Sequence, residues 1–323
     1  MNILVPRTDK LGDFITALPA MYVLKKYDSS NKIIACVSSL NEVLANKCDF
    51  IDEVIVDDPQ SSIFSLVKKL RDKRVDVSIT LYSNTRIAIA QALALIPKRI
   101  APATKIAQIF YTKRVKQRRS KVKMAEFEYN LALTQALFND IDTSYKKPLL
   151  ELTGTKEVQD VFCINHDIYP VREIVAFHIG FGGSSDANWT PQEYESLIRS
   201  MLKQNKYQIV LTFGPDEKKL YEEMKIRLRE EDVVLYLSLD GLIYFAKLIS
   251  NFKLFVSTST GTYHLASLVG TPTMTFFGDS RFASALRWKG VGDENLQTHY
   301  MLPKESEQRK KVFEEVRIAL LAL

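Results

Sequence analysis

Residues 253–269, KLFVSTSTGTYHLASLV, contain the pattern that decides the fold. The apolar and β-branched residues at 253–257 predict a buried strand, and the spacing of apolar residues at 262–269 predicts a helix. The turn between them is rich in hydroxyl groups and contains one glycine, Gly261. A strand, a short turn and a helix in this order predict a βαβ unit, and therefore a parallel sheet.

The same alternation runs through both halves of the chain and predicts the α/β fold class with two Rossmann-like halves. Pro19 marks either the first turn of a helix or a kink, whereas Thr190 and Pro191 are typical of an N-cap and the first helical residue. We predict further strands at residues 2–5, 32–37, 53–56, 76–81, 174–179, 207–213, 233–237 and 273–277. We predict further helices at residues 14–26, 62–71, 124–138, 190–204, 216–229, 242–249 and 305–321.

A mixed, polar stretch at residues 139–172 separates the two halves and contains Pro148, Gly154 and Pro170. We expect an N-terminal Rossmann-like domain at residues 1–155 and a C-terminal one at residues 156–323, whose last helix could pack back on the first domain. Ligands of open α/β sheets bind at the carboxyl ends of the strands. The two parallel sheets are therefore expected to face each other across a cleft. This cleft is where we expect the ligand-binding site.

The composition of the 323 residues is ordinary for a globular enzyme, with 44 Lys and Arg against 38 Asp and Glu and a net charge of +6. No stretch approaches the roughly 18 apolar residues of a membrane span. The three cysteines, Cys36, Cys48 and Cys163, are too scattered for a disulfide framework or a zinc cluster. The N-terminus reads as a strand without a secretory signal, so we expect a cytoplasmic protein.

The first candidate site is RTDKLGD, residues 7–13, which follows the first strand and precedes a helix. Gly12 lets the backbone approach a ligand closely. Asp13 lies near the helix N-terminus, where the helix dipole favours an ionised carboxylate that could accept a proton from a substrate hydroxyl. The alternative is that Asp13 only caps the helix. The loop lacks GxGxxG, which disfavours a nicotinamide dehydrogenase.

The second candidate site is the turn of residues 257–264, where Ser259 precedes the helix start. The amides of Thr260, Gly261 and Thr262 would form an anion seat at the helix N-terminus, and His264 could donate to a phosphate oxygen. The alternative is Ser/Thr capping with His264 as a satisfied core histidine.

Two further strand-end loops could contact the same ligand. HIGFGGSSDANW, residues 178–189, offers backbone amides and hydroxyls for phosphate oxygens. FGPDE, residues 213–217, offers the Glu217 carboxylate for ribose hydroxyls, although Asp216 as a helix cap is equally plausible. The phosphate-binding residues expected in the first of these loops are Gly182, Gly183, Ser184 and Ser185.

The remaining patterns are weak. Asp140 and Asp142 match the DxD of metal-dependent sugar transferases but are interpreted as a solvated loop, and no His or Cys spacing suggests a metal. The basic run at residues 113–123 is either a solvated face or a surface that attracts phosphates or an anionic bilayer. It lacks interleaved aromatic residues, so we expect no nucleic-acid partner.

These motifs resemble glycosyltransferase family 9, the heptosyltransferases of lipopolysaccharide core assembly. Residues 7–13 with Leu18, Pro19 and Ala20 resemble the family's opening motif. Residues 178–189 resemble its Gly/Ser loop, and residues 257–278 resemble its signature S-N-D-T-G-x-x-H-x-A-A-x-x-G-T-P. The resemblance spans both halves of the chain and implies the GT-B fold.

The resemblance also implies an inverting transfer that needs no metal or other cofactor, from ADP-L-glycero-D-manno-heptose to a lipopolysaccharide core or lipid-linked acceptor at the inner membrane. Asp13 would be the general base, and the helix start at 260–264 would hold the donor diphosphate. The expected donor-binding set is Gly12, Gly182, Gly183, Ser184, Ser185, Glu217, Ser259, Thr260, Gly261, Thr262 and His264. The expected acceptor-binding set is Arg7, Lys10, Arg114, Arg118 and Arg119.

Two departures from the family pattern concern the donor sugar. Ala187 stands where the family often has Lys, and Ser259 stands where it has Asp. Lys10 or Arg281 could replace the missing cation. A sugar-nucleotide epimerase and a non-catalytic nucleotide-sugar-binding protein of the same fold remain alternatives.

Overall fold

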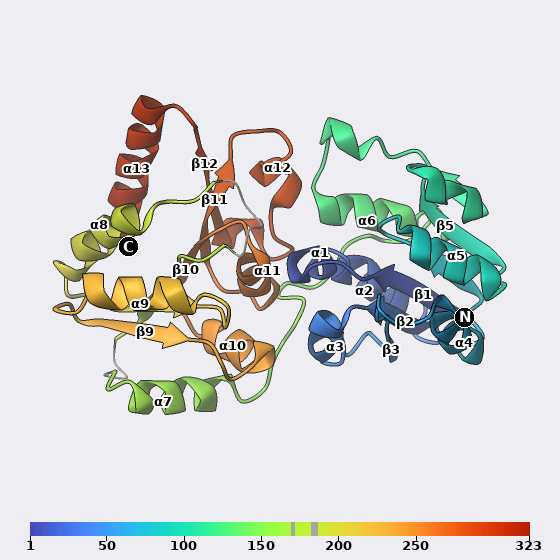
Figure 1. Ribbon diagram of the computed structural model, residues 1–323, viewed down its shortest axis with the longest axis horizontal. Helices are drawn as coiled ribbons and strands as arrows, with labels where there is room; N and C mark the ends of the chain where they lie inside the picture. The colour runs from blue at the N-terminus through green and yellow to red at the C-terminus, as the bar shows by residue number, and fades with distance from the viewer. Residues whose placement is uncertain (169–171, 182–186) are drawn as a thin grey trace. The chain divides into compact units, whose positions relative to one another are not determined.

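The computed structural model describes residues 1–168, 172–181 and 187–323. The chain divides into two compact units, Met1–Leu149 and Leu150–Leu323, called unit 1 and unit 2. Each unit contains a six-stranded sheet in which every pair of neighbouring strands is parallel (Figure 1). The α/β class and the two parallel sheets are therefore confirmed.

The sheet of unit 1 has the strand order β3-β2-β1-β4-β5-β6, so the order reverses between β1 and β4. Its strands are β1 (Asn2–Arg7), β2 (Lys32–Val37), β3 (Glu53–Val56), β4 (Val77–Ile79), β5 (Lys98–Pro102) and β6 (Lys113–Val115). Its helices are α1 (Leu11–Ile15), α2 (Leu18–Tyr27), α3 (Ser39–Ala45), α4 (Ile63–Asp72), α5 (Thr85–Leu93), α6 (Glu126–Thr134) and the 3-10 segments η1 (Ile106–Phe110) and η2 (Arg119–Lys121).

The sheet of unit 2 has the order β12-β11-β10-β7-β8-β9 and reverses between β10 and β7. Its strands are β7 (Ile174–His178), β8 (Gln208–Phe213), β9 (Val233–Leu237), β10 (Leu254–Thr258), β11 (Thr273–Gly278) and β12 (Gln297–Leu302). Its helices are α7 (Thr155–Asn165), α8 (Pro191–Leu202), α9 (Lys218–Arg227), α10 (Leu242–Ile249), α11 (Gly261–Leu268), α12 (Ala285–Trp288), η3 (Glu294–Leu296) and α13 (Ser306–Leu321).

The central strands have side chains buried on both faces. All five residues of β7 and of β10 are buried, as are five of the six in β1. Parallel strands covered by helices on both sides read as continuous apolar runs rather than as alternating ones, which is why these strands were predictable. In unit 2 the core extends to the C-terminal helix, where Val316 and Leu320 of α13 are fully buried.

The predicted helix at 14–26 is in fact two helices, α1 and α2, with Thr16 and Ala17 between them. Pro19 lies in the first turn of α2, so the first-turn interpretation of Pro19 is confirmed and the kink is not observed. The predicted start of α8 is also confirmed, because Pro191 is its first residue and Thr190 caps it in a capping box with Glu193.

Several elements lay outside the predicted set. The stretch expected to be a polar boundary contains α7, which packs against α10. The sequence also gave no strand at β5, β6 or β12 and no helix at α3, α5 or α12. No helix in the described ranges is both long and apolar enough to cross a bilayer.

Candidate functional site

Three of the four predicted site loops begin at strands where a sheet reverses its order, and the fourth, residues 213–217, follows β8, the neighbour of β7. In unit 2, β10 pairs with β7, and Ser257 is opposite His178 at their carboxyl ends. In unit 1, β1 pairs with both β2 and β4 and ends at Arg7. Such reversals leave a crevice outside the carboxyl ends of the strands, where ligands of open α/β sheets bind. The geometry of each unit is described separately below.

The start of α11 is an uncapped helix N-terminus. Thr260 is the N-cap residue, but its side chain makes no capping hydrogen bond and its Oγ1 lies 2.8 Å from Oγ1 of Thr262 instead. The first amides of a helix have no intrahelical acceptor. Because the Thr260 side chain does not cap them, the amides that follow Thr260 carry the partial positive charge of the helix dipole and can bind an anion.

His264 lies in this helix and is 3% exposed. Its Nδ1 has no hydrogen-bond partner among the described residues. Burial lowers the pKa of the imidazole to about 4, so it is neutral at physiological pH. A buried polar atom without a partner is costly, so Nδ1 of His264 is available to a ligand as far as the described residues show.

The carboxylate of Glu217 is held tightly at the ends of β7 and β8. Its Oε2 accepts a hydrogen bond from the amide of Gly214 at 2.7 Å and lies 3.8 Å from Nε2 of His178. A Cβ on Gly180 would lie 1.8 Å from Oε1 of Glu217, so any side chain at position 180 would have to displace this carboxylate. The N-cap of α9 is Glu217 itself, so the interpretation of Asp216 as the cap is wrong.

The ring of His178 is the second buried histidine at this edge. Its Nδ1 lies 3.0 Å from Oγ1 of Thr212, and burial lowers its pKa although Glu217 favours the charged form. The predicted phosphate-binding residues that follow it in the chain lie outside the described residues: Gly182, Gly183, Ser184 and Ser185.

A cavity of about 290 Å³ opens at the carboxyl ends of β11 and β12. Ala187 lines it, and the carbonyl of Ala187 accepts a hydrogen bond from Oγ1 of Thr258, which connects the cavity wall to the end of β10. Two cationic side chains, Lys304 and Arg309, also line it. The sequence analysis named neither as a site residue, because neither belongs to a recognisable motif.

The two cations of this cavity differ in their partners. Arg309 donates to the carbonyl of Asn188 at 2.8 Å and to Glu193 at 3.0 Å, and its guanidinium lies 4.5 Å from the centre of the Trp189 ring. The ammonium of Lys304 makes no hydrogen bond or ion pair with any residue of the described ranges. Arg281, one of the cations suggested by the sequence, is exposed on the loop after β11.

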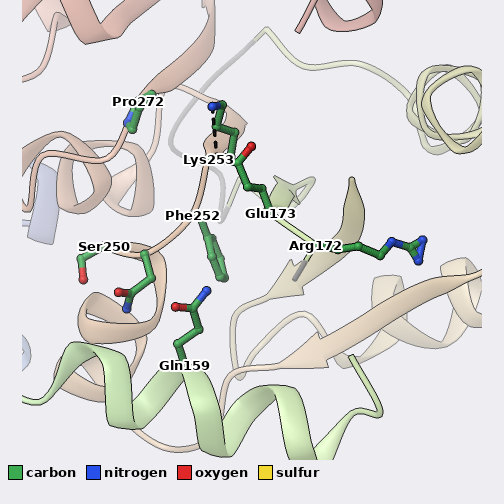
Figure 2. A pocket seen from close by; sticks show the side chains of 8 residues that line it. Gln159, Arg172, Glu173, Ser250, Phe252, Lys253 and Pro272 are labelled. Atoms are coloured by element: carbon green, nitrogen blue, oxygen red, sulfur yellow. Dashed lines mark hydrogen bonds and ion pairs between the residues drawn. The ribbon is translucent and has the colours of Figure 1, made fainter. Parts of the chain in front are cut away.

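A second cavity of unit 2 lies at the opposite edge of the sheet. It measures about 330 Å³ and is lined by residues next to the amino ends of β7, β10 and β11 (Figure 2). The ammonium of Lys253 lies 3.2 Å from Glu173, whereas the side chain of Arg172 extends away from both and pairs with Asp232. Since ligands of parallel sheets bind at carboxyl ends, this cavity is not the predicted site.

In unit 1 the loop after β1 surrounds a buried arginine. The guanidinium of Arg7 is 2% exposed and donates to Asp9 at 2.8 Å and to Asp13 at 2.7 Å. Arg7 was expected to bind the acceptor, but the structure shows its side chain engaged with these two carboxylates. Asp13 is the third residue of α1, whose N-cap is Lys10, so Asp13 does not cap the helix as the alternative required.

Asp13 has the properties of a base near neutral pH. Burial raises the pKa of its carboxyl to about 6, against the opposing effect of Arg7. Oδ1 accepts the hydrogen bond from Arg7, and Oδ2 has no hydrogen-bond partner among the described residues. Gly12, beside it, is buried within α1.

The basic run contributes one residue to this network. Arg119 donates to Glu126 at 2.5 Å and to Asn130 at 3.2 Å, and Glu126 lies 3.6 Å from Arg7. By contrast, Lys10, Arg114 and Arg118, also predicted to bind the acceptor, are exposed.

The structure describes no cluster of metal-binding side chains within residues 1–168, 172–181 and 187–323. The two carboxylates of the DxD-like pair bind other side chains. Asp142 forms an ion pair with Lys26 at 2.8 Å, and Asp140 accepts a hydrogen bond from the Tyr27 hydroxyl.

Comparison with known proteins shows the family to which this chain belongs. The family model described as "Glycosyltransferase family 9 (heptosyltransferase)" matches residues 63–316. This chain belongs to glycosyltransferase family 9. A Haemophilus influenzae protein described only as a glycosyltransferase is 33% identical over 316 residues, which are 95% of this chain and 91% of that one. The chain is therefore a glycosyltransferase.

Solved structures of family 9 enzymes share the fold. ADP-heptose lipopolysaccharide heptosyltransferase II of E. coli aligns with a TM-score of 0.80 and 18% identity over 100% of this chain and 99% of its own. A family 9 protein from Veillonella parvula aligns with a TM-score of 0.79 and 18% identity, over 98% and 89%. E. coli heptosyltransferase WaaC with ADP aligns with a TM-score of 0.73 and 18% identity, over 98% and 99%. The GT-B fold is thus confirmed.

Proposed function

We propose that this family 9 enzyme transfers a sugar, with heptose from ADP-heptose as the first candidate, to a hydroxyl of a lipopolysaccharide core or lipid-linked acceptor. The transfer inverts the anomeric centre and uses no metal ion. The observation that carries the proposal is Asp13, a carboxyl with a pKa raised to about 6 and one oxygen without a described partner.

The donor diphosphate binds at the N-terminus of α11. The amides after Thr260 supply fixed positive dipoles, and neutral His264 supplies an N–H donor without a titrating charge near pH 7. Such donors stabilise negative charge that develops on a leaving group, because they are already oriented before the reaction. They can therefore stabilise the negative charge of the departing nucleoside diphosphate, as a metal ion does in other transferases.

Asp13 is the general base. Its Oδ2 accepts the proton of the acceptor hydroxyl while the hydroxyl oxygen attacks the anomeric carbon. The bond to the diphosphate oxygen breaks on the opposite face, and the nucleoside diphosphate leaves with the electron pair, so the configuration inverts. Arg7 is a positioning residue, because its bond to Oδ1 leaves Oδ2 for the substrate. A positioned base contributes about 10²–10⁴-fold in rate.

The side chains around the diphosphate-binding helix N-terminus determine which nucleotide sugar binds as the donor. Glu217, held by Gly214, is positioned to accept ribose hydroxyls, and Ser259 contacts the sugar or its phosphate. The cavity beside Ala187 supplies the cation that the family pattern places at this position, through the ammonium of Lys304. ADP is favoured as the nucleotide because a heptosyltransferase of the same fold was solved with it.

The acceptor meets unit 1. The exposed cations Lys10, Arg114 and Arg118 attract a phosphorylated or acidic glycan, and the acceptor's lipid anchor implies contact with the anionic inner membrane. The enzyme would then act from the cytoplasm.

The epimerase alternative has weaker support. A UDP-GlcNAc 2-epimerase from Methanocaldococcus jannaschii aligns with a TM-score of 0.59 and 13% identity, which shows a shared fold alone. Epimerisation needs acid and base groups around the sugar ring, whereas Asp13 is the one convincing carboxylate that the sequence offered for this role.

The test is transfer from ADP-heptose to lipopolysaccharide core acceptors by the wild type and by Asp13→Asn, with ADP binding measured by calorimetry. Asn keeps the oxygen that accepts from Arg7 but cannot take a proton. We expect transfer to fall at least 100-fold with ADP affinity unchanged. Asp142→Asn is the matched control and should transfer normally, with or without a chelator. Undiminished transfer by Asp13→Asn would refute the proposed base.

A further inference from the structure

Arg7 is a buried guanidinium that divides its donors among three carboxylates. Its Nε donates to Asp9 at 2.8 Å, and its Nη2 donates to Oδ1 of Asp13 at 2.7 Å. Its Nη1 makes no hydrogen bond with the described residues and lies 3.6 Å from Oε1 of Glu126. The contact between Arg7 and Asp13 therefore joins one nitrogen to one oxygen.

This single contact differs from the geometry that such pairs frequently adopt. Arginine and carboxylate side chains often bind through two parallel hydrogen bonds, because the planar fork of the guanidinium matches the two oxygens. A second bond of this kind would occupy Oδ2 of Asp13, the oxygen assigned above to the substrate proton. It would also stabilise the ionised carboxylate and make it a weaker base. Arg7 does not close on Asp13 in this way, and its Nη1 faces Glu126 instead.

The carboxylate of Glu126 is itself held in place by a second arginine. Glu126 is 4% exposed and is the first residue of α6, where the helix dipole favours a negative charge. Nη1 of Arg119, in η2, donates to Oε1 of Glu126 at 2.5 Å. This oxygen therefore faces two guanidinium groups, and its contact with Arg119 is the shorter one.

The helix α6 is also fixed to the helix that carries Asp13. Nδ2 of Asn130 donates to the carbonyl of Thr16, the C-cap of α1, at 3.0 Å. Oγ1 of Thr16 in turn donates to the carbonyl of Asp13 at 2.7 Å. Nη2 of Arg119 donates to Oδ1 of Asn130 at 3.2 Å. One helix thus fixes the position of Glu126 and, through Thr16, that of Asp13.

Other charged or titratable side chains surround Asp13 at greater exposure or with other partners. They are Asp9, Lys10 at the N-cap of α1, Glu42 of α3, Tyr82 and Lys105 of the loops after β4 and β5, and Glu128 of α6. Lys10, Glu42 and Lys105 are exposed, so water and salt screen their charges. The charge of Glu126 is buried and is screened much less.

We propose that Glu126 is a positioning residue for Asp13 and that Arg119 restrains it. Glu126 attracts Nη1 of Arg7 and thereby prevents the two-bond pairing that would occupy Oδ2. Arg119 keeps Glu126 from drawing Arg7 away from Oδ1. Arg119 therefore supports the reaction without touching the acceptor, which differs from the acceptor contact that the sequence suggested. The inference rests on the proposed function, because it takes Asp13 as the base.

The two residues should move the titration of Asp13 in opposite directions. Glu126→Gln keeps an oxygen for Arg119 but removes the charge, so Arg7 closes on Asp13 and the pKa of Asp13 falls below about 6. Arg119→Gln releases Glu126 toward Arg7, so Asp13 shares its counter-charge and its pKa rises. We expect a shift of roughly half a unit to one unit in each case. Arg119→Lys keeps the positive charge and should restore most of the wild-type value.

The titration of Asp13 can be measured without substrate. Urea unfolding from pH 4 to pH 8 is compared between each variant and the same variant that also carries Asp13→Asn, because the difference between the two curves reports the Asp13 titration. The pH of half-maximal transfer is measured in parallel and should shift with the same sign. Glu126→Gln should also lower kcat at pH 8 and leave the donor KM unchanged, because the base is weaker and its Oδ2 is occupied.

Asp57→Asn is the matched control. Asp57 is also 4% exposed in unit 1 and pairs with Arg86 at 3.1 Å, but this pair joins the end of β3 to α5. It should leave the titration of Asp13 unchanged.

Equal Asp13 titrations in the wild type, Glu126→Gln and Arg119→Gln would overturn the proposal, and so would shifts of the same sign in both variants. An equal shift in Asp57→Asn would overturn it too. If the unfolding curves shift as expected but the pH dependence of transfer does not follow them, the proposed base fails and the contact of Glu126 with Arg7 is confirmed.

Discussion

The raised pKa of Asp13 should make activity and folding stability change in opposite directions with pH. Burial moves this pKa from 3.8 to about 6, so between these values the folded protein binds a proton that the unfolded chain releases. The folding stability contributed by this group is therefore full below pH 4 and falls as the pH rises through 6. A carboxylate that destabilises the protein at working pH is typical of a functional site.

The size of the effect follows from the shift. About two pKa units correspond to about 3 kcal/mol of folding free energy lost between pH 4 and pH 7. The side chain is 23% exposed, so solvent screening is limited. Asp13→Asn removes the titration and keeps an oxygen that can accept from Arg7. We therefore expect Asp13→Asn to be as stable as the wild type near pH 4 and more stable by up to about 3 kcal/mol above pH 7.

The assay is urea unfolding of both proteins from pH 4 to pH 8, together with the pH dependence of transfer by the wild type. The base is active when deprotonated, so transfer should fall roughly tenfold per pH unit below pH 6 and reach a plateau above pH 7. Parallel stability curves for the two proteins would refute the raised pKa. A transfer rate independent of pH between 5 and 8 would refute the role of Asp13 as the base.

Two further predictions concern unit 2. Gly180→Ala places a methyl group 1.8 Å from the Glu217 carboxylate and must displace it, so we expect weaker donor binding, seen as a higher donor KM. His264→Phe keeps a buried ring but removes the N–H donor, so ADP should bind about tenfold more weakly in calorimetry. Unchanged ADP binding would exclude His264 as a phosphate ligand.

Much of the fold was predictable because burial makes its sequence signal strong. The strand at residues 32–37 lies at the predicted bounds, since parallel strands packed by helices are continuous apolar runs. The missed elements lack that signal for physical reasons. β6 is the three-residue edge strand KRV, and β12, QTHYML, is mostly half-buried, so polar side chains hide both.

The loops of the candidate site could be predicted from the sequence, but the long-range contacts of its side chains could not. The glycine and hydroxyl pattern identified the start of α11, and the aspartate after β1 identified Asp13, because both depend on local spacing. That Glu126 lies beside Arg7, or that Arg309 covers Trp189, depends on contacts more than 100 residues apart in sequence. No local pattern encodes such contacts, and they decide which cations are free and which are already bound.

The same long-range packing makes the pH test of Asp13 specific. Histidine is the side chain that ordinarily titrates between pH 5 and 8, and the chain has four. Burial lowers the pKa of all four, of His264 to about 4 and of His166, His178 and His299 below their usual value. His264, which must be neutral for donor binding, would therefore produce its acid limb near pH 4. An acid limb near pH 6 that Asp13→Asn abolishes from the residual transfer thus reports the carboxylate, whereas one that persists in the variant must arise from another group.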